Sequence, residues 1–175
     1  MEIGVKLPLI TPQELVLVVI MTTDLLDRSD RRLLTILQED GRISIVDLAD
    51  RVGLSPTATT ERVKRLTRDG YITGYGARLD PEKLGRGLLV FIEVKLDRTT
   101  PEVFERFAQA VARAPEVLEC HMVAGGFDYL VKTRIADMAA YRSFLGEVLL
   151  SLPGVRETHT FAVMEEVKST TALPL

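Results

Sequence analysis

Cysteine and tryptophan are the residue types that this chain of 175 residues most nearly lacks, since it has one cysteine and no tryptophan. With Cys120 alone, a disulfide within the chain and a zinc site made of several cysteines are both excluded. The two histidines, His121 and His159, stand apart from clustered carboxylates. The sequence therefore predicts no metal site, and a packed or interface role for these side chains.

Long hydrophobic runs are also missing. The run from Leu15 to Met21 is strongly apolar but far too short to span a bilayer. The basic flank and the small-residue cleavage site of a signal peptide are absent around it. We therefore predict a cytoplasmic protein with no membrane partner. Residues 1–20 are expected to be an extension upstream of a native start at Met21; an extra N-terminal strand or arm is the alternative.

A surplus of basic charge is lacking as well. The chain has 22 Lys and Arg against 25 Asp and Glu, which gives a net charge of −3. Such a protein is not a general binder of polyanions, so any contact with DNA needs a local basic patch. Arg62, Lys64, Arg65 and Arg68 supply one.

The stretch from Gly41 to Tyr75 predicts two short helices joined by a tight turn. Ser44 is placed to cap the first helix, with Asp47 completing a capping box, and Gly53 is placed to end it. A supporting helix is expected before this pair, from a cap at Ser29 to about residue 40.

The second helix of the pair is expected from Pro56 to about Arg68, with Ser55 as its cap. Helical spacing turns Thr59, Val63 and Leu66 inward. The remaining side chains are mostly hydroxyls and cations and are the predicted DNA-binding residues: Ser55, Thr57, Ala58, Thr60, Glu61, Arg62, Lys64, Arg65 and Arg68. A helix with this outer face after a Gly-containing turn is typical of one that lies in the DNA major groove. The alternative is a helical hairpin with a solvated, charged face.

Domain boundaries follow from these patterns. Residues 21–80 are predicted to form the helix-turn-helix domain, in which residues 70–79 make a short wing or a hinge. Residues 81–87 are predicted to be a linker. Residues 88–175 are predicted to form a second domain of a different kind.

This second domain shows strand patterns interrupted by helical ones. Apolar or alternating runs predict strands at Leu88–Leu96, Val117–Ala124, Tyr129–Ile135 and Val155–Met164. Helices are expected after Pro101 and after a cap at Asp137. The order βαββαβ predicts an α+β protein whose second domain is a ferredoxin-like sandwich. Since the helices cover one sheet face, the other is expected to pair in a homodimer.

Ordered segments in both domains carry a family resemblance. They are DRSDRRLLTILQEDGRIS, LADRVGLSPT, ERVKRL, GYITGY, ECHMVAGGFDYLVKTR, MAAYRSFLGEVLLSLPGV and VMEEVK. From about Leu26 to Lys168 the chain resembles the leucine-responsive/asparagine-regulator (Lrp/AsnC) family. The resemblance implies a (winged) helix-turn-helix domain joined by a hinge to the ferredoxin-like domain. Among the predicted contacts, it singles out Ser55, Thr57, Arg62 and Arg65.

The resemblance also implies an amino-acid effector bound between dimers, at the turn joining the second and third strands. At this turn, Gly125 and Gly126 let backbone N–H groups approach a carboxylate, and Asp128 pairs with an ammonium group. The expected effector-binding residues are Val90, His121, Ala124, Gly125, Gly126, Asp128, Leu150 and Phe161. The alternative is a plain hairpin turn, with glycine for positive φ and Asp128 for capping.

Enzyme chemistry is not predicted, because the sequence shows no nucleophile–base pair, no paired carboxylates in one turn and no phosphate loop.

With the resemblance, the sequence predicts a sequence-specific, nucleoid-associated transcriptional regulator of amino-acid metabolism genes. Its expected partners are double-stranded DNA, a free amino acid (leucine-like or proline) and further copies of itself, as dimers assembled into an octamer or similar. No other cofactor is expected. The alternatives are an effector-independent DNA-organising protein and an amino-acid-binding domain with an enzymatic role. Departures from the family pattern at Ala58, Thr59, Ala124 and Gly126 leave base preference and effector open.

Overall fold

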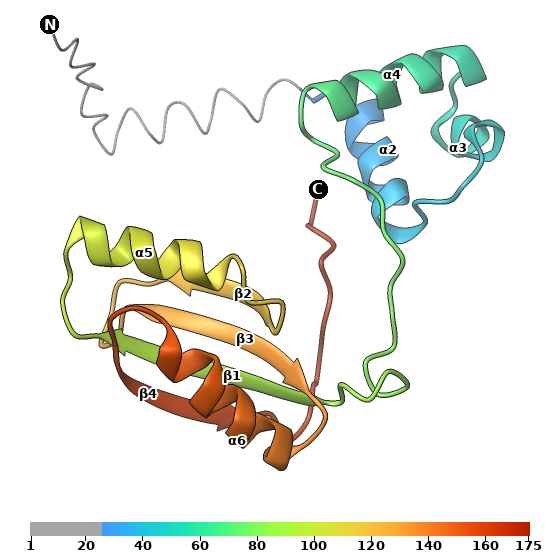
Figure 1. Ribbon diagram of the computed structural model, residues 1–175. Helices are drawn as coiled ribbons and strands as arrows, with labels where there is room; N and C mark the ends of the chain where they lie inside the picture. Colours follow the sequence, from blue (N-terminus) through green and yellow to red (C-terminus); the bar gives the residue numbers. More distant parts are fainter. Residues whose placement is uncertain (1–25) are drawn as a thin grey trace, which may run out of the picture. The chain divides into compact units, whose positions relative to one another are not determined.

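The computed structural model of the protein describes residues 26–175 (Figure 1). The expected N-terminal extension and the native start at Met21 lie outside these residues. The described chain forms two compact units. The first contains residues 26–77 together with Thr170–Leu175, and the second contains Arg78–Ser169. The last residues of the chain thus belong with the first unit, whereas the sequence pattern attached them to the second domain.

Helices α2 (Arg28–Glu39), α3 (Ile45–Val52) and α4 (Pro56–Arg68) build the described part of the first unit. The predicted cap at Ser44 is confirmed, because its hydroxyl accepts the Asp47 N–H at 3.1 Å. The capping box predicted there is incomplete, since the Asp47 carboxylate accepts the Ser44 hydroxyl at 2.7 Å instead of the Ser44 N–H. Gly53 ends α3 with a left-handed φ of 73°, as predicted.

The start of α2 differs from the prediction. Ser29 lies inside the helix, and the N-cap is Asp27. The Asp27 carboxylate accepts the Asp30 N–H at 2.8 Å, and the Asp30 carboxylate accepts the Asp27 N–H at 3.2 Å. Two carboxylates therefore form a capping box here, and their charge also suits the positive end of the helix dipole.

A small apolar core joins the three helices. Its buried residues are Leu33, Leu34, Ile36, Leu48, Val52 and Leu66. Helix α4 begins and ends as predicted, with the Ser55 hydroxyl accepting the Ala58 N–H at 3.2 Å. Thr59 is fully buried in α4, and its hydroxyl has no hydrogen-bond partner among the described residues. After α4, residues 72–80 form neither helix nor strand.

The second unit is an antiparallel sheet with helices on one face (Figure 1). Its strands lie in the order β2-β3-β1-β4 and are β1 (Leu88–Leu96), β2 (Val117–Met122), β3 (Tyr129–Ile135) and β4 (Val155–Ala162). Its helices are α5 (Pro101–Val111), α6 (Met138–Glu147) and the short 3₁₀ helix η1 (Leu149–Ser151). The predicted βαββαβ order and the α+β class are confirmed. Strands β2 and β4 end two residues earlier than predicted.

The two sheet faces have different chemistry. Alternating residues of β1, including Val90, Ile92 and Val94, pack under the helices in a core of fourteen buried residues. On the open face, β1 and β4 pair Phe91 with Phe161, Glu93 with His159 and Lys95 with Glu157. On β1 and β4 the open face therefore carries one aromatic pair beside pairs of polar side chains, rather than a continuous apolar surface.

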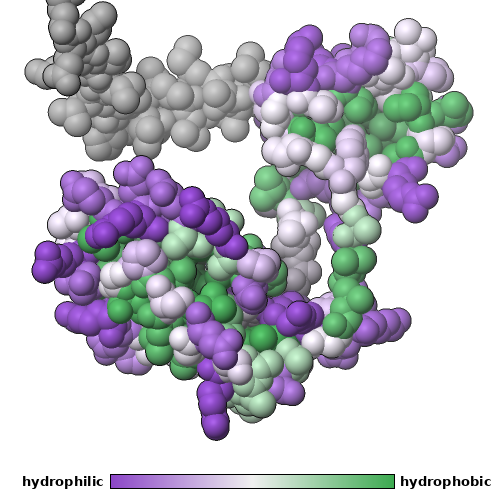
Figure 2. Space-filling view, viewed as in Figure 1, coloured by the Kyte–Doolittle hydropathy of each residue, from purple (hydrophilic) through white to green (hydrophobic). Residues whose placement is uncertain are grey.

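Hydrophilic side chains cover the outer sides of α4 and α5 (Figure 2). The described helices are at most 13 residues long, and in residues 26–175 none combines the length and the apolar character needed to cross a bilayer.

Candidate DNA-binding helix and ligand pocket

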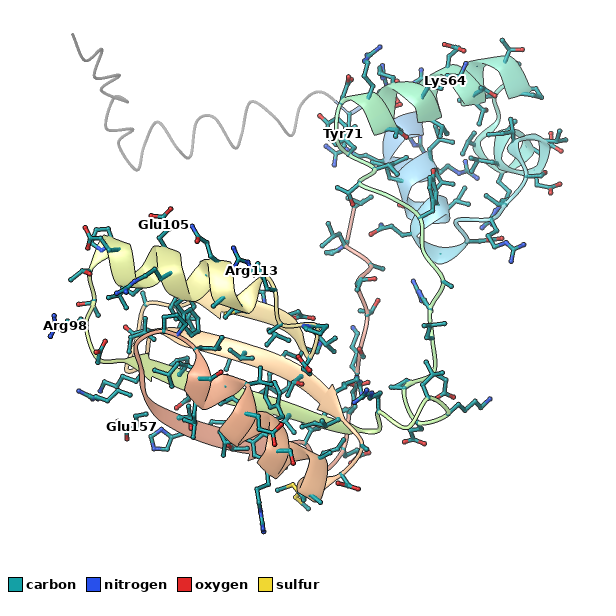
Figure 3. All side chains as sticks on the ribbon, viewed as in Figure 1. Lys64, Tyr71, Arg98, Glu105, Arg113 and Glu157 are labelled. Atoms are coloured by element: carbon teal, nitrogen blue, oxygen red, sulfur yellow. The ribbon has the colours of Figure 1, made fainter. Side chains whose placement is uncertain are left out.

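Helix α4 presents three stripes of side chains, which follow from its repeat of 3.6 residues. Thr59, Val63 and Leu66 face the core, as predicted. A second stripe, with Arg62 and Arg65, faces α2. The third, which we call the outward stripe, lies opposite the core and contains Thr57, Thr60, Glu61, Lys64 and Arg68. Figure 3 shows Lys64 on the side of α4 turned away from α2.

Both cations of the outward stripe are exposed and pair with a neighbouring carboxylate. Lys64 Nζ lies 3.0 Å from Glu61 Oε1, with 68% and 67% of these side chains exposed. Arg68 Nε lies 2.9 Å from Asp69 Oδ1. Exposed pairs of this kind contribute little to stability, because water screens both charges. A phosphate group can therefore replace either carboxylate at little cost.

Arg62 and Arg65 are engaged with the first turn of α2. Arg62 Nη1 lies 2.5 Å from Asp27 Oδ2 and 2.9 Å from Asp30 Oδ1. Arg65 Nη2 lies 2.5 Å from Asp30 Oδ2. Because the Asp30 side chain is only 1% exposed, two guanidinium groups balance a buried carboxylate. We call Asp27, Asp30, Arg62 and Arg65 the acid–arginine cluster.

The acid–arginine cluster fixes one helix on another. The Asp30 N–H and the Arg62 guanidinium hold the pKa of Asp27 below its ordinary 3.8. Hydrogen bonds to Asp27 and Asp30 raise the pKa of Arg62. Asp27 and Arg62 therefore stay charged at neutral pH. Since removing one partner of a buried ion pair costs about 3–5 kcal/mol, the cluster strongly resists separation of α4 from α2.

The turn between β2 and β3 is closed by its own backbone. The Val123 N–H donates to the Asp128 carbonyl at 3.0 Å, and the Asp128 N–H donates to the Val94 carbonyl at 3.0 Å. Asp128 Oδ2 also accepts the Leu96 N–H at 2.7 Å. Asp128 thus has a structural role that joins the turn to β1.

The two glycines of this turn are not explained by backbone conformation. Neither Gly125 nor Gly126 has a left-handed φ, so the positive φ considered for a plain hairpin turn is wrong. A Cβ added to either would meet no atom within 4 Å. The glycines leave open space beside an accessible backbone.

A pocket of about 380 Å³ lies beside the turn and is lined by Glu93, Lys95, Gly126, Phe127, Glu157 and His159. His159 Nδ1 lies 3.9 Å from Glu93 Oε2, and His159 Nε2 lies 3.7 Å from Glu157 Oε1. The lining residues Glu93, Lys95, Glu157 and His159 were not among the predicted effector residues. Period-two alternation in β1 and β4 places all four on one face, and this was the available signal.

The predicted effector residues are spread over the second unit. Gly126 lines the pocket, and Ala124, Gly125 and Asp128 share its turn. Val90 is fully buried under the helices, so contact with a ligand there would require the core to open. Leu150 and Phe161 are half exposed, on η1 and on β4. His121 on β2 lies 3.3 Å from Glu119.

Cys120 is half-buried, and burial raises the pKa of its thiol to about 11. The thiol is therefore protonated at neutral pH and is a poor nucleophile. Within residues 26–175, no group of three or more His, Cys, Asp or Glu side chains is arranged to hold a metal ion.

Comparison with known proteins assigns each of the two parts of the chain to a known kind of domain. A winged helix-turn-helix DNA-binding model matches residues 26–73, and an Lrp/AsnC ligand binding domain model matches residues 89–173. The leucine-responsive regulatory protein of Escherichia coli K12 is 58% identical over 148 residues, which are 85% of this chain and 90% of that protein. The chain belongs to the Lrp/AsnC family.

Solved structures of Lrp/AsnC relatives share the fold. A transcriptional regulator from Neisseria meningitidis in complex with L-Met is 40% identical, with a TM-score of 0.81 over 85% of this chain and 96% of that one. An AsnC family transcriptional regulator from Agrobacterium tumefaciens is 36% identical, with a TM-score of 0.81 over 85% and 97%. This Lrp/AsnC protein is thus a DNA-binding transcriptional regulator with a ligand-binding domain, and not an enzyme. The predicted family, fold and functional class are confirmed, while the individual site residues stay predictions.

Proposed function

We propose that the outward stripe of α4 enters the major groove of double-stranded DNA. The observation that carries this is its chemistry, because hydroxyls and exchangeable cations lie on a helix whose other stripes are held by the core and the acid–arginine cluster. Lys64 and Arg68 bind phosphates in this arrangement, while Thr57, Thr60 and Glu61 face base edges.

The other predicted contacts take supporting positions. Ser55 caps α4 and Ala58 lies in its first turn, at the end of a recognition helix that approaches bases. Arg62 and Arg65 stay on Asp30 and orient α4. Direct phosphate contact by either arginine is the alternative, and the salt dependence of DNA affinity separates the two roles.

The ligand is a free amino acid bound at the β2–β3 turn. Glu93 and Glu157 suit an ammonium group, while Lys95 and the open backbone at Gly126 suit a carboxylate, so the pocket complements both ends of a zwitterion. The relative solved with L-Met supports this class of ligand. Leucine, another branched-chain amino acid and proline are the candidates for this chain.

Copies of the chain assemble through the open sheet face, where Phe161 is 51% exposed opposite Phe91. Dimers then join into an octamer or a similar assembly, with the ligand at the junction between dimers. A ligand that favours one assembly changes the spacing of the α4 helices along DNA, and thermodynamic linkage makes the DNA and ligand affinities reciprocal. The regulator acts in the cytoplasm, on the nucleoid, at genes of amino-acid metabolism.

The test is binding of the full-length protein to its own upstream DNA, with and without a panel of amino acids. A sequence-preferring complex altered by one amino acid supports the proposal and names the ligand. A complex indifferent to all of them indicates the alternative, an effector-independent DNA-organising protein. Equal binding to random DNA would contradict sequence-specific recognition.

Asp128→Asn examines the ligand site in the same assay. An amide oxygen can still accept the Leu96 N–H, so the turn is retained while the charge is removed. We expect loss of the amino-acid response with DNA binding retained. A normal amino-acid response in Asp128→Asn would show that the Asp128 charge is not part of the proposed ligand site.

A further inference from the structure

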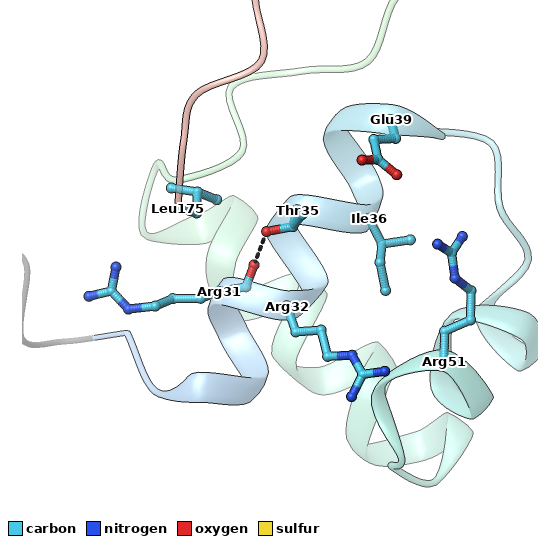
Figure 4. A pocket seen from close by; sticks show the side chains of 7 residues that line it. All are labelled: Arg31, Arg32, Thr35, Ile36, Glu39, Arg51 and Leu175. Atoms are coloured by element: carbon cyan, nitrogen blue, oxygen red, sulfur yellow. Dashed lines mark hydrogen bonds between the residues drawn. The ribbon is translucent and has the colours of Figure 1, made fainter.

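One side of α2 carries a cavity that none of the roles above uses. Its volume is about 440 Å³, and its lining residues are Arg31, Arg32, Thr35, Ile36, Glu39, Arg51 and Leu175 (Figure 4). Leu175 belongs to a segment that follows the last strand of the second unit in sequence yet lies in the first unit. We call this segment, Thr170–Leu175, the tail.

Gln38 on α2 holds the tail by its backbone. Gln38 Nε2 donates to the Leu173 carbonyl at 3.1 Å, and the Leu173 N–H donates to Gln38 Oε1 at 2.6 Å. A carboxamide that donates and accepts in this way reproduces the paired hydrogen bonds between antiparallel strands. It fixes the register of the tail without contacting a particular side chain, and the Leu173 side chain is accordingly 69% exposed.

The tail is ordered on both sides of this contact. The Thr170 hydroxyl accepts the Ala172 N–H at 3.1 Å, which forms a local turn. Pro174 restricts the backbone before Leu175, whose side chain is half covered beside the cavity. The turn and Pro174 leave the undocked tail fewer conformations than an unrestricted segment would have, so less conformational entropy is lost on docking. A few contacts therefore suffice to hold the tail.

We propose that this side of α2 is a docking site for the chain's own tail, and that docking gives the ligand-binding unit a second hold on the DNA-binding unit. The chain leaves the first unit after Ala77 and returns to it at Thr170, so the units are joined by two covalent connections once the tail is docked. Two attachments at different points restrict rotation of one unit relative to the other, which a single connection allows. A tethered segment also binds at an effective concentration of about a millimolar, so weak contacts are enough.

The place of docking relates it to DNA recognition. Helix α2 carries Gln38 near its end and Asp30 in its first turn, and Asp30 holds Arg62 and Arg65 of α4. A tail docked on α2 is therefore attached to the same rigid pair of helices that presents the outward stripe. This regulatory part rests on the proposed function, whereas docking itself does not.

Hydrogen exchange in the full-length protein tests docking without DNA or ligand. In Gln38→Ala, the Leu173 amide should exchange roughly fivefold to tenfold faster, as expected for loss of one or two hydrogen bonds. Gln38→Glu should be intermediate, because a carboxylate accepts the Leu173 N–H but donates nothing to its carbonyl. Gln109→Ala is the matched control, since Gln109 is an exposed glutamine on α5 that bonds to Glu105. Equal exchange in Gln38→Ala and the unmodified chain would overturn docking.

Cross-linking identifies which tail is docked. Gln38→Cys and Ala172→Cys are combined with Cys120→Ser and treated with a short bismaleimide. A linked product of monomer mass on a denaturing gel supports docking within one chain. A linked dimer would assign the tail to a second copy and overturn the proposal, as would the absence of any linked product.

The regulatory part has its own readout. Gln38→Ala should keep its DNA affinity without ligand within about twofold and should weaken the ligand-induced change in that affinity by about fivefold, a typical allosteric coupling. An unchanged ligand response, with the exchange result as predicted, would overturn the second hold while leaving docking intact. Absence of any ligand response in the unmodified chain would instead count against the proposed function.

Discussion

The DNA-binding unit and the ligand-binding unit are stabilised in different ways. The ligand-binding unit has a core of fourteen buried apolar residues between its sheet and its helices. The described part of the DNA-binding unit has a core of six, and it adds the acid–arginine cluster. Because the three described helices of this unit are short and bury little apolar surface, ion pairs fix the angle between α2 and α4 where packing alone is sparse. Charge is therefore part of the architecture of α4 as well as of the surface that we propose binds DNA.

Phe107→Ala should give the largest loss of stability, confined to the ligand-binding unit. Phe107 is fully buried and its ring centroid lies 4.4 Å from that of Tyr129. Truncation of a buried phenylalanine costs about 3–5 kcal/mol. Calorimetry of the full chain should show one transition shifted down, independently of salt. Leu118→Ala, at a half-exposed leucine, is the control and should change little. A Phe107→Ala effect as small as that of the control would contradict the role of the apolar core.

Asp30→Ala should be the corresponding change in the DNA-binding unit. It leaves Arg62 and Arg65 without their buried partner and removes half of the capping box. We expect the free energy of unfolding of this unit to fall by about 3 kcal/mol, which is the lower end for buried pairs because the arginines are partly exposed. Asp50→Ala, at an exposed carboxylate on α3, is the control. Equal melting of the two variants would show that the cluster does not hold α4.

Thr59→Val should act in the opposite direction. The Thr59 hydroxyl is buried without a hydrogen-bond partner among the described residues, and valine has nearly the same shape. Removing such a group should stabilise the unit by about 1 kcal/mol, measured by urea unfolding. In the control Thr67→Val, an exposed hydroxyl that donates to the Val63 carbonyl at 2.9 Å is lost, so no gain is expected. Destabilisation by Thr59→Val would indicate that the hydroxyl is satisfied.

The ion pair of Asp27 with Arg62 should make the smallest of these contributions to stability, and acid should remove it. The pKa of Asp27 lies below its ordinary 3.8, so its contribution to stability is fully present above that pH and is lost as pH falls through the lowered value. Asn at this position still caps α2 but cannot form the ion pair with Arg62. The stability difference between the unmodified chain and Asp27→Asn should therefore shrink below about pH 4. A difference that is independent of pH would contradict the pairing.

Local signals predicted much of this fold from the sequence. A capping hydroxyl and a proline predicted the start of α4, and alternation predicted β1 and β3. The cap of α2 was mispredicted at Ser29, although the spacing of Asp27 and Asp30 is a local signal for the capping box that the structure shows. Arg62, which lies 35 residues away in sequence, reinforces the choice of Asp27. Local patterns contain no information on such a partner.

The candidate sites were less predictable for the same reason. Helical periodicity separates Arg62 and Arg65 from the outward stripe, but only the packing of α2 on α4 shows that they meet Asp30. Likewise, Glu93 and His159 become neighbours only through the register of β1 with β4. The glycine-rich turn was located by resemblance, whereas the charged residues beside it depend on how the strands pair.

The central claim is that the outward stripe contacts DNA while Arg62 and Arg65 position α4. The most direct measurement is the slope of log affinity against log salt concentration for the unmodified chain, Lys64→Ala and Arg65→Ala. It is made at a temperature where all three are folded by circular dichroism. Lys64→Ala should make the slope shallower by about 1, as for loss of one phosphate contact, and Arg65→Ala should leave it unchanged while lowering the melting temperature. An unchanged slope in Lys64→Ala, together with a shallower slope in Arg65→Ala, would contradict the account.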